Sequence, residues 1–73
     1  MKVSGLDIHK DSIFCGIYNG AKQSEVKEFT TLTPDIKALG VYLKAEGVKR
    51  VAMESTGTYW IPIWNILESM GFI

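Results

Sequence analysis

The chain has 73 residues, of which 47% are hydrophobic, and eight basic side chains balance eight acidic ones to give a formal net charge of zero. This length predicts one small domain, and the composition is typical of a globular protein. A neutral chain has no global field that attracts nucleic acid. No hydrophobic run is long enough to cross a bilayer and no signal-peptide pattern opens the sequence, so we expect no membrane association.

Cysteine usage indicates the compartment. Cys15 is the single cysteine, so an internal disulfide is impossible, and no set of Cys and His has the spacing of zinc ligands. Proteins without disulfides are typical of reducing compartments. We therefore expect a cytoplasmic protein.

Three strands are predicted in the first 30 residues. Residues 3–8 are short, mostly apolar and rich in β-branched side chains, as in a central strand. After a polar turn, residues 12–18 alternate between apolar and other side chains, and Asn19-Gly20 then favours a tight hairpin turn. Residues 23–30 form the returning strand, whose charges suit an exposed edge.

The hydrophobic period then changes toward 3.6 residues, which predicts a helix. Thr33 offers an N-cap hydroxyl and Pro34 suits the first helical position, with Asp35 favourable in the first turn. Gly47 is expected to end the helix, because glycine tolerates the left-handed conformation of a C-terminal cap. The buried stripe of this helix is expected to contain Ile36, Leu39 and Leu43.

A second buried strand, residues 48–54, follows directly, and residues 58–70 then show another helical pattern. The regular helix is expected to begin near Pro62, because an interior proline loses a backbone hydrogen bond. Little of this helix is polar, so we expect self-association through it or through an open sheet edge. Gly71 predicts a helix stop and residues 72–73 the start of another strand, from which we expect the chain to be a fragment. The side chains expected on one side of this helix are Trp60, Ile63, Trp64, Leu67 and Met70.

The predicted order is three strands, a helix, a strand, a helix and the start of a strand, which gives an α/β fold with a mixed sheet. A right-handed crossover can return the fourth strand parallel to the first, on the side opposite the second. Asp7 and Glu54 end these two strands, and a strand spacing of about 4.8 Å then brings their carboxylates together. Such a pair suits a hard divalent cation. Ribonuclease H-like folds have this arrangement.

A resemblance to a known family lies in two segments of the chain. The segments are Gly5-Leu6-Asp7-Ile8-His9-Lys10-Asp11-Ser12 and Met53-Glu54-Ser55-Thr56-Gly57-Thr58-Tyr59-Trp60. The resemblance of the second segment continues through Pro62, Trp64-Asn65-Ile66-Leu67-Glu68 and Gly71-Phe72. They resemble the N-terminal part of insertion-sequence transposases with a RuvC-like catalytic domain, the DEDD transposases of the insertion-sequence family numbered one-ten. The resemblance covers nearly the whole chain.

The resemblance implies a DNA recombinase of prokaryotic cells that uses magnesium (Mg2+) and a tetrad of Asp, Glu, Asp and Asp. Asp7 matches the first acid and Glu54 the second, both as metal ligands and catalytic residues. The family's remaining acids belong to an Asp-x-x-Asp segment, and no such segment follows Glu54 here. The implied partners are DNA and a structured guide RNA. We expect the chain by itself to fold at least in part without catalysing.

Other polar residues beside the two acids have an ordinary interpretation next to a functional one. Lys10 can contact phosphate or simply be solvated in its turn, and Ser55 and Thr56 can contact nucleic acid or cap a helix. His9 is expected to be a solvated turn residue, because magnesium sites favour oxygen ligands.

Two other functions remain open. An actin-like or sugar-kinase-like phosphotransferase also has an acid on its first strand, but its Asp-x-Gly-Ser/Thr hairpin is not matched by Asp7-Ile8-His9-Lys10. A non-catalytic self-association module is the other alternative. Further sequence with an Asp-x-x-Asp segment favours the transposase, whereas an adenosine-binding motif favours the kinase.

Overall fold

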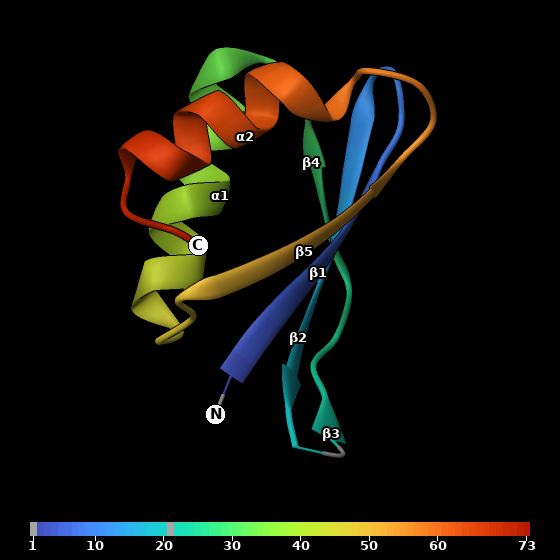
Figure 1. Cartoon of the computed structure of the whole chain (residues 1–73). Helices are drawn as coiled ribbons and strands as arrows, with labels where there is room; N and C mark the ends of the chain where they lie inside the picture. The colour runs from blue at the N-terminus through green and yellow to red at the C-terminus, as the bar shows by residue number, and fades with distance from the viewer. Residues whose placement is uncertain (1, 21) are drawn as a thin grey trace.

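The computed structural model describes residues 2–20 and 22–73. Five strands and two helices make up the described chain (Figure 1). Their bounds are β1 Lys2–Ile8, β2 Ser12–Asn19, β3 Lys22–Gln23, β4 Lys27–Thr30, α1 Thr33–Ala45, β5 Arg50–Ser55 and α2 Trp60–Ser69. Neither helix is both long enough and apolar enough to span a membrane in the described part of the chain.

The strands form one mixed sheet. Its order is β3-β2-β1-β5, and β4 also pairs with β2. Strand β1 is antiparallel to β2 but parallel to β5, because helix α1 carries the chain back before β5 begins. The prediction of an α/β fold with a mixed sheet is therefore confirmed.

The prediction of one returning strand over residues 23–30 is wrong, because that segment contains the end of β3 and then β4. Three residues, 24–26, stand opposite two residues of β2, Gly16 and Ile17, which is the signature of a β-bulge. Ser24 bonds Ile17 twice, since the Ile17 amide donates to the Ser24 hydroxyl (3.0 Å) and the Ser24 amide donates to the Ile17 carbonyl (2.7 Å). A side-chain acceptor thus replaces a backbone acceptor, and the ladder is interrupted.

Helix α1 begins one residue earlier than predicted. Leu32 is its N-cap residue and Thr33 is already helical, so the expected cap hydroxyl of Thr33 is not used. The Thr30 hydroxyl instead accepts a hydrogen bond from the Leu32 amide (3.2 Å) and donates one to the carboxylate of Asp35. At the other end Gly47 has φ +78°, and the helix stops there as predicted.

Helix α2 begins at Trp60, slightly before the expected start at Pro62. The proline lies in the first turn, where backbone amides have no partner within the helix, so its missing N–H costs little. Ile63 and Leu67 are fully buried, whereas Trp60, which was expected on the same side of the helix, is exposed. Beyond the helix, the Ile73 amide donates to the Lys49 carbonyl and the Val51 amide donates to the Ile73 carbonyl, both at 3.0 Å.

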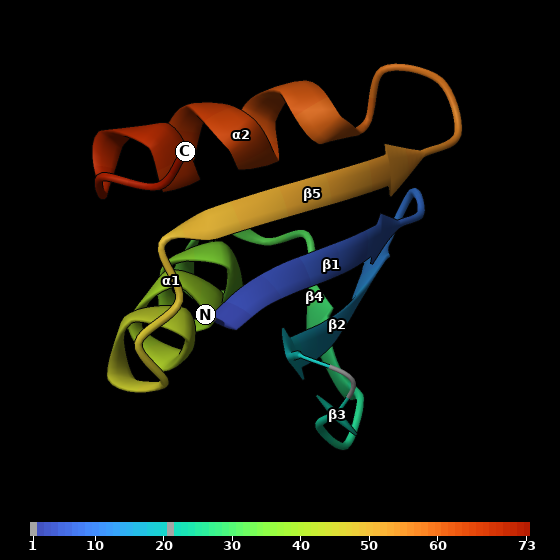
Figure 2. The same cartoon turned by 60° about the horizontal axis from the view of Figure 1, so that its bottom comes forward.

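The two faces of the sheet differ. Both helices pack against one face (Figures 1 and 2), and the core lies between them and that face. The core side chains are Leu6, Ile8, Ile13, Cys15, Ile17, Ile36, Leu39, Leu43, Val48, Ile63, Leu67 and Phe72. No described helix covers the opposite face, which we call the open face. Strand residues alternate between the two faces, so each strand contributes to both.

Candidate metal and nucleic-acid site at the open face

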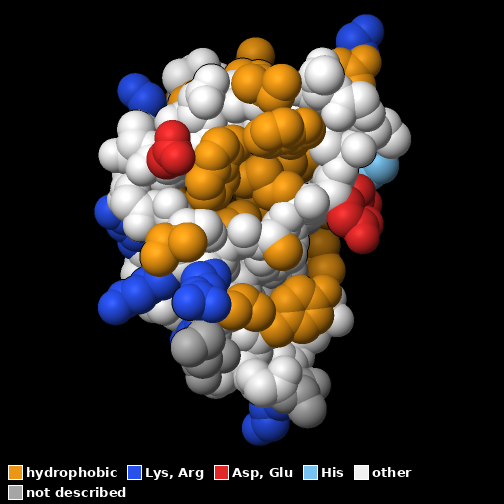
Figure 3. All heavy atoms as spheres, viewed as in Figure 1, with side chains coloured by type: hydrophobic (Ala, Val, Ile, Leu, Met, Phe, Trp, Pro, Cys, Tyr) orange, Lys and Arg blue, Asp and Glu red, His pale blue; other side chains and the backbone are white. Residues whose placement is uncertain are grey.

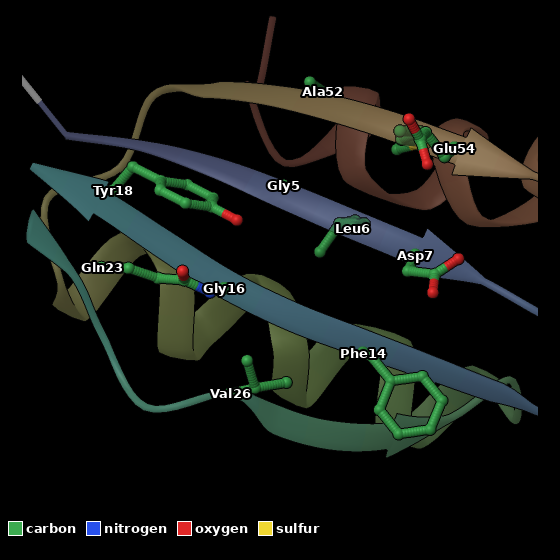
Figure 4. A pocket seen from close by; sticks show the side chains of 11 residues that line it. Gly5, Leu6, Asp7, Phe14, Gly16, Tyr18, Gln23, Val26, Ala52 and Glu54 are labelled. Atoms are coloured by element: carbon green, nitrogen blue, oxygen red, sulfur yellow. The ribbon is translucent and has the colours of Figure 1, made fainter. Parts of the chain in front are cut away.

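The parallel pairing of β1 and β5 sets Asp7 directly opposite Glu54. Side chains at paired positions of neighbouring strands point to the same face of a sheet. Figure 4 shows both carboxylates on the open face, at the same end of the sheet. The prediction that the two strands are parallel neighbours, with their acids on one face, is confirmed.

Both carboxylates are open to solvent. The Asp7 side chain is 58% exposed and Glu54 is also exposed, so neither charge carries a large desolvation penalty. Two acids on adjacent strands can share a hydrated cation, since magnesium commonly keeps several waters and takes one or two carboxylates. The donor chemistry of this pair therefore fits magnesium.

The pair by itself is an incomplete ligand set. Within residues 2–20 and 22–73, no group of three or more His, Cys, Asp or Glu side chains is arranged to hold a metal ion. Two flexible, exposed carboxylates should bind magnesium weakly, because tight sites need more ligands and a fixed geometry.

His9 lies closer to this site than the sequence suggested. Its Nε2 atom is 3.1 Å from Oδ2 of Asp7, and its ring stands edge-on to Phe14, with ring centroids 5.7 Å apart and an interplanar angle of 81°. The side chain is 47% exposed. The expectation of a solvated turn residue did not include these two side-chain contacts. In Figure 3 the histidine lies next to acidic side chains at the edge of the molecule.

Lys10, Ser55 and Thr56 gather at the same end of the sheet as the two acids. Lys10 is in the turn between β1 and β2, and the register sets Ile8 opposite Ser55 at the end of β5. Local hydrogen bonds occupy part of these loops: the Thr31 hydroxyl donates to the Lys10 carbonyl (3.1 Å), and the Ser55 hydroxyl donates to the Thr56 carbonyl (3.3 Å). The lysine side chain and Thr56 remain exposed.

A shallow groove of about 430 Å³ runs along the open face from the acids toward β3 (Figure 4). Its walls include Tyr18 and Phe14, which are 39% and 36% exposed. The other residues that line it are Gly5, Leu6, Asp7, Gly16, Gln23, Val26, Ala52, Met53 and Glu54.

Small residues on neighbouring strands make the floor of this groove. Gly5 pairs with Gly16 on one side and with Ala52 on the other. A Cβ atom on Gly5 would lie 3.3 Å from Cε2 of Tyr18, so the tyrosine ring covers part of the floor. Sequence reasoning missed the groove, although alternate positions 14, 16 and 18 of β2 already separate two aromatic residues by a glycine.

Comparison with known proteins adds no family assignment. No protein-family model matches this chain, and no curated protein is significantly similar to it.

Proposed function

We propose that this chain is part of a ribonuclease H-like, RuvC-like catalytic domain of a DNA transposase, in which Asp7 and Glu54 hold magnesium for cleaving and rejoining DNA strands. The observation that carries the proposal is the parallel register that sets these two acids opposite each other on the open face. The two sequence motifs that resemble the DEDD transposases contain the same two residues.

Magnesium, when bound, supplies charge that stabilises the attacking and leaving oxygens of a phosphodiester. Asp7, on the central strand β1, is the residue placed to be the main ligand, and Glu54 supports it from β5. The further acids of the tetrad would come from an Asp-x-x-Asp segment of the complete enzyme. By itself the described chain should bind the metal weakly and leave DNA uncut.

Nucleic acid would meet the site at the loops that flank the two acids. Lys10 supplies a positive charge there, and Ser55 and Thr56 supply hydroxyl and backbone donors, which are the groups that contact phosphate in protein–DNA complexes. The chain as a whole is neutral, so these local contacts and the metal must attract the DNA and any guide RNA.

The phosphotransferase alternative is weaker because of the turn after β1. Phosphate-binding hairpins rely on glycine and free backbone amides, but residues 9–11 contain no glycine, and the His9 amide already donates to the Ser12 carbonyl (2.8 Å).

The self-association alternative has one observation in its favour. Tyr59, Trp60 and Ile61 are exposed at the start of α2, and Figure 3 shows hydrophobic side chains at the surface between α2 and β5. Such a surface can hold copies of the chain together and is compatible with a catalytic role.

Binding of Mn²⁺, a paramagnetic substitute for magnesium, tests the proposed site on the chain as it is. We expect Mn²⁺ at millimolar concentration to broaden the amide NMR signals near residues 7 and 54 first. Asp7→Asn and Glu54→Gln should both weaken binding, because each removes one charged ligand. The dissociation constant should rise about tenfold or more for Asp7→Asn, the proposed main ligand, and less for Glu54→Gln, the supporting ligand. Glu46→Gln, an exposed acid after α1, is the matched control and should change nothing.

Broadening that Asp7→Asn leaves intact would refute the metal assignment. In a longer protein that contains this chain, Asp7→Asn should abolish DNA strand cleavage while DNA binding persists. Cleavage by that variant would show that the reaction does not depend on this acid, and self-association without metal binding would favour the assembly module.

A further inference from the structure

The turn between β1 and β2 directs His9 toward the acid pair. Strand β1 ends at Ile8 and β2 begins at Ser12, and the bond from the His9 amide to the Ser12 carbonyl (2.8 Å) closes the turn. This bond fixes the backbone of His9 two residues after Asp7. Residues two apart along an extended chain point to the same side, so the imidazole can reach the open face.

Two contacts then hold the imidazole in place. Nε2 lies 3.1 Å from Oδ2 of Asp7, and because an ionised carboxylate only accepts hydrogen bonds, a hydrogen bond between these two atoms requires a proton on Nε2. The ring also meets Phe14 edge-on. Phe14 is the residue paired with Asp7 across the β1–β2 ladder. The imidazole is therefore bounded by the carboxylate and by the aromatic neighbour of that carboxylate.

We propose that His9 is a positioning residue for Asp7, which fixes the plane of the carboxylate by binding Oδ2 and leaves Oδ1 for the metal ion. This inference rests on the proposed function. An exposed aspartate otherwise rotates freely about its last side-chain bond, and a rotating ligand binds metal less well than a fixed one. Partners that hydrogen-bond a metal ligand are known to orient it in this way.

His9 is assigned this role in place of direct ligation for two reasons. Its Nε2 atom is already engaged by Asp7, and magnesium prefers oxygen to nitrogen. An ordinary surface pair between His9 and Asp7 is the competing interpretation, and such pairs contribute little to stability. The two interpretations differ in what the loss of His9 does to metal affinity.

Metal affinity of three variants tests the proposal, with Mn²⁺ as the probe and amide broadening as the measurement. His9→Leu should raise the dissociation constant about tenfold, the lower end of the usual effect of losing a partner of a metal ligand. His9→Gln keeps a side-chain donor and should recover most of the affinity. Phe14→Leu removes only the edge contact and should weaken binding by about threefold.

A second measurement needs no metal. At pH 8 the ¹⁵N chemical shifts of the His9 ring report which nitrogen carries the proton, and we expect it on Nε2. Asp7→Asn should reduce this preference, because the side-chain amide of asparagine can donate a hydrogen bond as well as accept one. Lys37→Gln, an exposed residue of α1, is the control and should alter neither the ring shifts nor the fold seen in the amide spectrum.

The outcomes separate the two proposals. If the wild-type chain binds Mn²⁺ at residues 7 and 54 and His9→Leu binds it equally well, the role of His9 is refuted and the proposed function stands. A proton mainly on Nδ1 also refutes it. If the wild-type chain does not bind Mn²⁺ there, the proposed function fails and the role of His9 falls with it.

Discussion

The two faces of the sheet share the same strands but have different compositions. On β1, Leu6 and Ile8 are buried against the helices, whereas Gly5 and Asp7, one position away, belong to the open face. The buried face holds branched aliphatic side chains that exclude water. The open face holds glycines, aromatic rings and two acids. Because the side-chain period of a strand is two, one short chain separates the residues that stabilise it from the residues available for chemistry.

The largest expected contrast between the two faces is in stability. Leu39 of α1 is fully buried in the core, so Leu39→Ala leaves a cavity and should destabilise the fold by about 2–5 kcal/mol. A domain of this size has only about 3–5 kcal/mol of net stability, so the substitution should remove a large part of it. Urea unfolding followed by circular dichroism measures this.

Val26 on the open-face groove provides the matched control. It is 50% exposed, so Val26→Ala should change the free energy of unfolding by less than about 0.5 kcal/mol. Equal losses for the two variants would contradict the division of the sheet into a stabilising face and an open face.

The buried face should also make stability depend on pH. Burial raises the pKa of the Cys15 thiol above its ordinary value, while a hydrogen bond with Ser4 and the charge of Lys27 lower it in part. The unfolded chain therefore loses this proton first, from about pH 8.5, and stability falls as the pH rises toward the folded-state pKa. The loss is about 1.4 kcal/mol for each pH unit that separates the two pKa values.

Urea unfolding at pH 7, 8.5 and 10, with reductant present, measures this dependence. The pKa of Tyr42 is also raised, chiefly by burial, but an unfolded tyrosine ionises only near pH 10, so the lower part of the range isolates Cys15. Cys15→Ala should be less stable at pH 7 and should show a flatter profile. An unchanged slope in that variant would assign the dependence to another group.

The sequence was sufficient for the elements whose signals are local. Alternation and the two helix stops predicted β1, β2, β5 and both helices, and the order of elements implied that β5 returns beside β1. The pairing of Asp7 with Glu54 could therefore be predicted from the sequence alone, because the period of two and a parallel register follow from those elements.

Features that depend on contacts between distant residues were not predictable in this way. The bulge at residues 24–26 arises because the Ser24 hydroxyl competes with the backbone for the Ile17 amide. The contact of His9 with Asp7 and Phe14 depends on how a three-residue turn bends, and composition does not specify that bend. The groove requires Gly5, Gly16 and Ala52 to be in register, which is known only once three strands are paired.

The smallest expected effect concerns the floor of that groove. A new Cβ at Gly5 meets only the edge of the Tyr18 ring, at 3.3 Å, and that ring is partly exposed and can move outward. Alanine also reduces the freedom of the unfolded chain, which favours folding by roughly 0.5–1 kcal/mol relative to glycine. Gly5→Ala should therefore stabilise the fold by up to about 0.5 kcal/mol while shifting the Tyr18 ring, as measured by urea unfolding and by nuclear Overhauser effects to that ring. A loss of more than about 1 kcal/mol in the free energy of unfolding would mean that the Tyr18 ring cannot move away from Gly5 and that the open face contributes to stability.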